Sequence, residues 1–554
     1  MASNDRRSSG FSRRDLLKGS GATAGLSALG LGAAAAAAEP DTRADAIDLR
    51  LINGRILTLD GKNTIASAVG IRDGRIVEVG RSVGRYARTI DLKGATLIPG
   101  LIDSHNHIYW SFRNPAHEAR AIELATSIPE FLQAIVELAR TLPAGELITC
   151  NGGWSRKGMA EKRLPTLAEL DRAAPDHPLW LTENQTEDVW IDPKKNPPLP
   201  SLTNSRGLAF FQKQDVTGDP ATGLIPWVES TAALQKLQTE EDRKRSIDNA
   251  IDFALGLGVT MIHDFGDGAT SDPSLESKYP YVLDLWREKK LKLRFRLRIS
   301  AEGGTLDGLK ARMLNGINRL GDDVLRLNGF GEGIGDGTDK GFVDAAKLVA
   351  SRGWSVHVHS VSVGKPGDTS QNVAHVEGYR AANAEHPIRN MRWSLAHVNY
   401  ITPELVQALK EMGAGVTGDA WQYTSDLEQV PMGPPWRMLV DSGIQVGGGS
   451  DGTGTAGFNP WLTIYYMTTG RINSGEIGNP GQTISRMEAL KILTKGSAWH
   501  SFDEDKLGTI EIGKLADVAV LSDDPLTVAD DKLRKVTSML TLQAGKIVHQ
   551  TRQF

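Results

Sequence analysis

Two histidines one residue apart, His105 and His107, follow the apolar run Ala95–Ile98 and the segment Pro99-Gly100-Leu101-Ile102-Asp103-Ser104. On a strand, residues i and i+2 point to the same face. Both imidazoles can therefore bind one metal ion from the end of a buried strand. Neutral imidazole suits zinc and neighbouring transition metals. The pair alone is weak evidence, because two ordinary loop histidines are the commoner explanation of such a pattern; a metal site needs further ligands from elsewhere in the chain.

Metal-binding side chains also end three later apolar runs. The runs are Val356–His359, Ser394–His397 and Gly447–Asp451. In a closed βα barrel the carboxyl ends of the strands meet at one rim, where the active site lies. His359, His397 and Asp451 would then join the first pair in a hydrolytic site.

Two further histidines, His263 and His357, fit less well into that set. His357 lies two residues before His359 on the same run, so alternation places it deeper in the barrel. His263 either lines the pocket or satisfies a hydrogen bond in the core, and the structural role is favoured.

The elements that would position these residues alternate between strand-like and helical patterns, which favours a parallel sheet of βα units. Residues 240–256 and 402–412 have apolar spacing near the helical period. Eight runs have the pattern of buried strands, the number that a closed TIM-like (βα)8 barrel needs: 97–103, 259–265, 291–299, 324–330, 355–360, 393–398, 414–418 and 444–451.

Short strands with Asn-Gly and Asp-Gly turns occur at both ends of the chain. The predicted α/β architecture is a barrel over residues 98–503 and a small β-sandwich built from residues 46–97 and 504–554. Residues of about 142–235 are predicted to be an insertion over the barrel mouth. It carries four tryptophans, and a lid and a purely structural elaboration remain alternatives: Trp154, Trp180, Trp190 and Trp227.

Composition excludes several classes of function. The chain has 554 residues and a formal net charge of −4, so neither nucleic acid nor an anionic membrane surface is expected as a partner. Cys150 is the only cysteine, which rules out an intramolecular disulfide and a cysteine-based metal cluster. We expect a small-molecule substrate, and a homodimer remains open.

Residues 1–38 resemble an export signal. The segment Ser12-Arg13-Arg14-Asp15-Leu16-Leu17-Lys18 is similar to the twin-arginine pattern, and a weakly apolar Gly/Ala run follows to Ala38. That run is too weakly apolar for a stable membrane anchor. The twin-arginine export machinery is therefore the expected partner, and the expected location is periplasmic or secreted. A tail with chance arginines is the alternative.

The chain resembles the amidohydrolase superfamily, and within it the branch of the N-substituted formamide deformylases. Four segments carry this resemblance, which covers roughly residues 46–551: Gly100–His107, Leu257–Asp264, Gly449-Ser450-Asp451 and Leu507–Asp517. The resemblance implies that His105, His107, His359 and His397 are metal ligands. It also implies that Asp451 contacts the metal and exchanges the proton of the attacking water.

The chain departs from this branch at two positions. Asn328 stands where the branch has a lysine that bridges two metals once it is carbamylated. Because asparagine brings no negative charge, we expect one ion, most suitably zinc. Glu332 is close enough to Asn328 in the sequence to supply that negative charge instead, but it is expected on the loop after the strand. Glu187 stands where the branch commonly has a histidine, which would alter specificity.

The resulting hypothesis is metal-assisted hydrolysis of an amide-type C–N bond, with Asp451 as general base and His397 free to orient the water or stabilise the oxyanion. Tryptophans near the strand ends could form an aromatic pocket, although each could equally be a packing residue: Trp110, Trp154, Trp421 and Trp461. Alternatives are a cyclic amide, carbamate, ester or amine substrate, or an exported binding protein without catalysis.

Overall fold

The computed structural model describes residues 47–554, except 82–84, 115, 186–196, 267–277, 301–304, 335–339, 362–366, 425–432 and 455. The predicted signal over residues 1–38, and the positions Glu187 and Trp190, lie outside the described residues. Within the described part of the chain, no helix is both long and apolar enough to cross a membrane.

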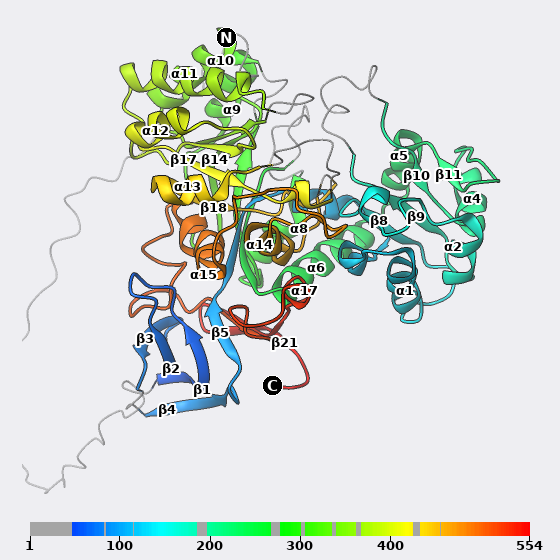
Figure 1. The fold of residues 1–554 in the computed structure, drawn as a ribbon, viewed down its shortest axis with the longest axis horizontal. Helices are drawn as coiled ribbons and strands as arrows, with labels where there is room; N and C mark the ends of the chain where they lie inside the picture. The colour runs from blue at the N-terminus through cyan, green and yellow to red at the C-terminus, as the bar shows by residue number, and fades with distance from the viewer. Residues whose placement is uncertain are drawn as a thin grey trace, which may run out of the picture. The chain divides into compact units, whose positions relative to one another are not determined.

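Eight strands form the central sheet and confirm the predicted α/β barrel. Neighbouring strands pair in parallel in the order β18-β17-β16-β15-β14-β13-β12-β6. Figure 1 labels β14, β17 and β18 of this sheet. The barrel strands are β6 (Leu101–Asn106), β12 (Val259–Asp264), β13 (Arg294–Ile299), β14 (Leu325–Gly331), β15 (Val356–Ser360), β16 (Ser394–His397), β17 (Gly415–Gly418) and β18 (Gln445–Gly448).

Helices connect these strands, as the alternation predicts. The two clearest patterns become α6 (Glu240–Gly256) and α12 (Pro403–Met412). Thr239 caps α6 in a capping box with Asp242, while α12 has Thr402 as its N-cap and Gly413 in the left-handed region at its end. The other helices that follow β12 in the chain are α8 (Pro280–Arg287), α9 (Leu306–Asn315), α10 (Lys340–Ser351), α11 (Ser370–Glu385), α13 (Trp436–Ser442), α14 (Pro460–Thr469), α15 (Arg486–Lys491), α16 (Ser497–Trp499) and α17 (Asp530–Leu533).

The first and last barrel strands, β6 and β18, are joined by side-chain and backbone hydrogen bonds and by a close approach at a glycine. The Asp103 carboxylate accepts hydrogen bonds from the Ser450 amide (3.0 Å) and hydroxyl (2.6 Å). The Asp451 amide donates to the His105 carbonyl over 2.9 Å. A side chain at Gly449 would lie 2.7 Å from the backbone of His105. Glycine at that position therefore lets β18 approach β6 closely enough to close the seam.

One predicted strand is two strands. The run 97–103 divides into β5 (Thr96–Pro99), which joins an outer sheet, and β6, which joins the barrel. The division falls at Gly100, where a Cβ would lie 2.2 Å from the Thr260 hydroxyl. Because both strands are buried, the apolar residues continue without a break across the junction. The sequence pattern therefore does not show that the chain passes there from the outer sheet to the barrel.

The two ends of the chain form one eight-stranded outer sheet. Its path runs β21-β20-β19-β5-β1-β2-β3, with β4 pairing alongside β1. β5 lies between the N-terminal and C-terminal parts, parallel to β1 and antiparallel to β19. The other outer strands are β1 (Ile47–Leu57), β2 (Ile65–Arg72), β3 (Arg75–Val79), β4 (Tyr86–Asp91), β19 (Val518–Leu521), β20 (Ser538–Gln543) and β21 (Lys546–Gln550).

A third, five-stranded sheet lies in sequence between β6 and β12. It begins at His117, upstream of the expected boundary near residue 142, because two residues of β7 already pair with β8. A strand of two residues is too short to show the alternation of apolar and polar residues from which a strand is predicted. Figure 1 shows most of this group in cyan and teal: β7 (His117–Glu118), α1 (Ile128–Ala139), β8 (Ile148–Asn151), α2 (Leu167–Ala173), β9 (Leu179–Thr182), β10 (Ser201–Leu202), α4 (Ser205–Gln212), β11 (Leu224–Ile225) and α5 (Trp227–Leu237).

Arginines fill one end of the barrel interior. Arg294 and Arg296 alternate along β13 and are fully buried. Arg294 Nε lies 2.6 Å from Asp517, and Arg296 Nε lies 2.7 Å from Asp503. Asp503 also binds Arg326 over 2.9 Å. Both aspartates come from the segment after the barrel, so that segment supplies the counter-charges of the barrel interior.

We expect Asp503→Asn to destabilise the fold by about 3–5 kcal/mol, because two buried guanidinium groups lose their anion. Burial alone would raise the pKa of Asp503, but Arg296 and Arg326 hold it below its usual value. Its stabilising contribution is therefore present at neutral pH and is lost as the pH falls through the folded-state pKa. Urea unfolding followed by tryptophan fluorescence measures the change.

The control is Asp530→Asn, which breaks the exposed pair with Arg486. This pair should change the free energy of unfolding by less than about 1 kcal/mol. Equal effects of the two substitutions would contradict the role assigned to Asp503.

Candidate metal centre

Six side chains that could bind metal converge at the carboxyl ends of five barrel strands. Each lies at the end of its strand or within a few residues after it, where a TIM barrel places its active site. They are His105 on β6, His107 just after it, Glu332 after β14, His359 on β15, His397 at the end of β16 and Asp451 after β18.

Glu332 lies at the centre of this cluster. Its Oε1 atom is 3.1 Å from His105 Nε2, 3.2 Å from His359 Nδ1 and 3.4 Å from His397 Nε2. Its Oε2 atom is 3.5 Å from His107 Nε2. All four histidines of the cluster therefore contact one carboxylate.

Asp451 supplies the second carboxylate. Its Oδ1 atom lies 3.3 Å from the Nε2 atoms of both His105 and His107. These three ligand atoms lie within 4.8 Å of one another, and so do those of His105, Glu332 and His397. Two overlapping sets of donors thus share His105.

Three of the four histidines have Nδ1 engaged away from the carboxylates. His107 Nδ1 donates to the Gly266 carbonyl over 3.2 Å, and His397 Nδ1 donates to Asp419 over 2.6 Å. His105 Nδ1 lies 3.4 Å from His357 Nε2. Their Nε2 atoms are thereby directed at the cluster, which is how an outer hydrogen bond usually orients a metal-binding imidazole.

The backbone at this site is unusual. Glu332, His397 and Asp451 have φ angles of 40°, 67° and 55°, in the left-handed region that side chains rarely adopt. Such conformations cost of the order of 1–3 kcal/mol each and collect at functional sites. In each case the turn follows a barrel strand and directs the side chain to the cluster.

The charges within the cluster shift the pKa of its groups in the direction opposite to the effect of burial. Burial alone would lower the pKa of His107, but the carboxylates of Glu332 and Asp451 raise it to about 10. Burial would likewise raise the pKa of Glu332, but His105 and His107 hold it well below its usual value. Both carboxylates are consequently ionised and available to a cation at neutral pH.

The donors fit a divalent transition metal. Imidazole nitrogens with carboxylate oxygens are ligands that zinc and its neighbours prefer. His105 Nε2 is fully buried and, among the described residues, lacks a partner with hydrogen-bond geometry although both carboxylates are close. A buried nitrogen in that state is suited to coordinate an ion.

Two predicted site residues lie away from the cluster. Asn328 is fully buried and donates its amide to the His500 carbonyl over 3.2 Å. His263 is also fully buried, and burial followed by the nearby charge of Arg298 holds its pKa well below the usual value. His357 lies behind His105, as alternation predicts, and its Nε2 atom is hydrogen-bonded to the Thr417 hydroxyl at 2.7 Å.

The tryptophans divide into two groups. Trp154 is buried against Phe131 in the core of the insertion, so it is a packing residue rather than a pocket wall. Trp461 is equally buried and donates to the Leu257 carbonyl over 3.0 Å. Trp110 and Trp421 are half-buried on segments that follow barrel strands, and Trp110 helps to line a small cavity of about 40 Å³.

Sequence inspection missed Asp419. This fully buried residue directly follows β17, and its carboxylate orients His397. The signal was present, because Asp419 is a polar residue after a barrel strand, as are the predicted ligands. It was overlooked because no histidine accompanies Asp419 at the end of β17.

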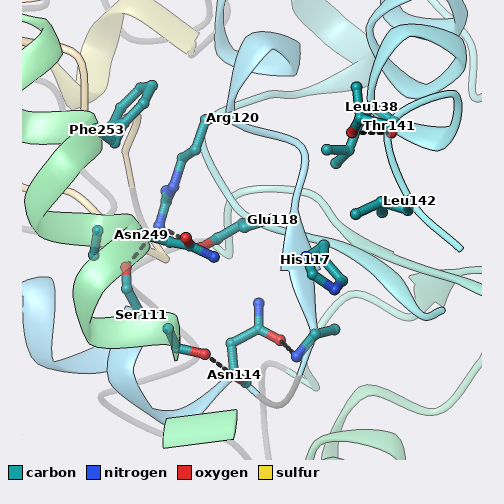
Figure 2. Close-up of a pocket in the computed structure, with 13 residues that line it drawn as sticks. Ser111, Asn114, His117, Glu118, Arg120, Leu138, Thr141, Leu142, Asn249 and Phe253 are labelled. Carbon is teal, nitrogen blue, oxygen red and sulfur yellow. Dashed lines mark hydrogen bonds and ion pairs between the residues drawn. The ribbon is translucent and has the colours of Figure 1, made fainter. Parts of the chain in front are cut away.

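A larger cavity, of about 360 Å³, is lined by other residues (Figure 2). On its wall Arg120 donates to Ser111 and to Glu118, both over 2.6 Å, and it reaches Glu123 at 3.0 Å. Glu123 also accepts from the Asn459 amide at 3.1 Å. These bonds tie the loop after β6 to the loop after β18, and so hold the segments that carry His107 and Asp451.

The model of the amidohydrolase family matches residues 88–549. An N-substituted formamide deformylase of Arthrobacter pascens is 23% identical over 571 aligned residues, covering 91% of this chain and 98% of the relative. The family match therefore includes the barrel, the outer-sheet strands β5, β19 and β20, and every residue of the cluster.

Solved structures share the fold. An uncharacterised metal-dependent hydrolase from Pyrococcus furiosus has a TM-score of 0.57 at 20% identity, covering 86% of this chain and all of that one. Atrazine chlorohydrolase from Arthrobacter aurescens, solved with zinc, has a TM-score of 0.53 at 18% identity, covering 91% and 95%. Since the family match spans most of the chain, this protein belongs to the amidohydrolase family.

Proposed function

We propose that the protein hydrolyses an amide-type C–N bond of a small molecule, with zinc as the preferred ion and Asp451 as general base. The observation that carries this proposal is the convergence of His105, His107 and His397 on two ionised carboxylates at the barrel rim. When bound there, a divalent ion lowers the pKa of water toward about 7 and polarises the substrate carbonyl.

The position of Asp451 suits proton transfer. Its carboxylate contacts both histidines of β6 and is almost fully buried. Burial alone would raise its pKa, but His105 and His107 hold the pKa well below the usual value, so the group is ionised. It can therefore accept the proton of the attacking water and return it to the departing amine.

His397 is held for a second role at the same rim. The Asp419 carboxylate fixes the ring through Nδ1, which leaves Nε2 facing Glu332 at 3.4 Å. An imidazole fixed in this way can bind an ion or stabilise the developing oxyanion. Asp419 acts through His397 and is thus a positioning residue.

We expect Asp451→Asn to lower kcat by ~10²–10⁴-fold, because the amide cannot accept the proton. The measurement is amine release from a panel that starts with N-substituted formamides, suggested by the deformylase relative, and extends to cyclic amides, carbamates and esters. Asp441→Asn, on the exposed face of α13, is the matched control. Turnover by the variant at the wild-type rate would contradict the role of Asp451.

We expect Asp419→Asn to weaken zinc binding by ~10–100-fold, as is typical when a carboxylate that orients a metal-binding histidine is lost. Competition with a chromophoric chelator gives the dissociation constant, and Asp441→Asn again serves as control. Unchanged zinc affinity would show that Asp419 does not position His397 for an ion.

We also propose that the protein is exported, on the strength of the twin-arginine pattern around Arg13 and Arg14. Replacing both with lysine should block export, because the pattern is read as an address rather than as general positive charge. Cell fractionation measures the outcome. The matched control replaces the other arginine pair, Arg6 and Arg7, with lysine and should be exported normally. Normal export of the Arg13 and Arg14 variant would contradict this interpretation of residues 1–38.

A further inference from the structure

The third arginine of β13 lacks the counter-charge that the other two have. Arg294, Arg296 and Arg298 alternate along this strand and are all buried. Arg294 pairs with Asp517 over 2.6 Å. Arg296 pairs with Asp503 over 2.7 Å. Arg298 is only 2% exposed, yet among the described residues no carboxylate forms an ion pair with it. Arg298 is therefore a buried cation without a protein anion beside it.

Neutral groups satisfy only part of the Arg298 guanidinium. Its Nη1 atom donates to the Phe330 carbonyl over 3.2 Å and to the Ser355 hydroxyl over 3.4 Å. Its Nη2 atom donates to the His500 carbonyl over 2.9 Å, and its central carbon lies 5.6 Å from the centre of the Phe265 ring. Its Nε atom is buried and has no hydrogen-bond partner within the described part of the chain. Burial lowers the pKa of Arg298 to about 9, which still leaves the group charged at neutral pH.

Two histidines near Arg298 have buried nitrogens that are likewise without partners. His263 lies on the neighbouring strand β12, and the ring of His357 contacts that of Phe265 at a centroid distance of 4.7 Å. Burial, followed by the charge of Arg298, holds the pKa of both histidines well below the usual value, so both rings are neutral. In the part of the chain that the structure describes, both nitrogens of His263 and the Nδ1 atom of His357 lack a hydrogen-bond partner.

These nitrogens are suited to donate. Arg298 Nε always carries a hydrogen, and a neutral imidazole such as that of His263 has one N–H. When His105 Nε2 holds an ion, its Nδ1 atom carries a hydrogen and donates to His357 Nε2, which lies 3.4 Å away. The hydrogen of His357 is then on Nδ1, and this step alone rests on the proposed function. Unused donors thus surround a positive charge.

We propose that Arg298, His263 and His357 bind a small monovalent anion of the halide class, such as chloride, inside the barrel beneath the metal centre. The anion supplies the negative charge that Arg298 lacks and accepts hydrogen bonds from its Nε atom and from the two imidazoles. Water would accept the same bonds but would leave the charge unbalanced, which is costly for a buried ion. A divalent oxyanion would bring more negative charge than Arg298 balances.

Bromide locates the site directly, because it substitutes for chloride and scatters X-rays anomalously. Crystals of the full chain soaked in sodium bromide should show an anomalous peak within hydrogen-bond distance of Arg298 Nε. A solvent peak there without anomalous signal would mean that water occupies the position and would overturn the proposal, as would the absence of any peak.

Thermal unfolding tests the same site in solution. At constant ionic strength, the Tm of the wild type should rise as chloride or bromide replaces gluconate, because an ion that binds only the folded chain stabilises it. Arg298→Met removes the charge and the donor, so its Tm should be the same in all three salts. A wild-type Tm that does not depend on the anion, or a variant Tm that still does, would contradict the proposal.

A second variant covers the case in which Arg298→Met fails to fold. His263→Phe keeps a ring but has no N–H, so the halide concentration at half effect should rise by about tenfold, the order expected for one lost hydrogen bond to an ion. An unchanged concentration would overturn the role of His263. The matched control is Arg287→Met, whose exposed side chain pairs with Asp284 on α8 and whose loss should leave the halide response as in the wild type. No substrate is needed, so a protein that binds halide but cleaves no amide would refute the proposed function alone.

Discussion

The site depends on the seam between the first and last barrel strands. Asp103 is fully buried there, and burial raises its pKa to about 6 although Ser450 and its other hydrogen-bond donors lower it. The hydrogen bonds of Asp103 to Ser450 fix the register of β18 against β6. They thereby fix the distance of Asp451 from His105 and His107. A slip of one residue at this seam would turn Asp451 away from the rim, because strand neighbours face opposite sides.

Charge governs what can be assembled at that rim. Glu332 and Asp451 place two carboxylates among the histidines, both on left-handed backbone. The conformational cost of these turns is offset by bonds outside the cluster, including the network of Arg120 that joins the flanking loops.

Much of the architecture could be predicted because periodicity and the ends of apolar runs are local properties. The eight barrel strands, the helix α6 and the strand-end positions of His105, His397 and Asp451 all follow from such patterns. The place of Glu332 does not, because it depends on a bulge and on one left-handed turn that change the alternation after β14. Asn328 lies in the same bulge and donates its amide to the His500 carbonyl rather than reaching the cluster.

The interleaving of the two chain ends also constrains when the protein can fold. β5 cannot complete its pairing until β19 is available, and Arg294 and Arg296 remain without counter-charges until Asp517 and Asp503 arrive. Contacts so distant in sequence form late. During synthesis, a ribosome-bound chain that already contains every barrel strand would still hold unpaired cations in its interior. Completion of the barrel interior must therefore await the segment that carries Asp503, Asp517 and β19.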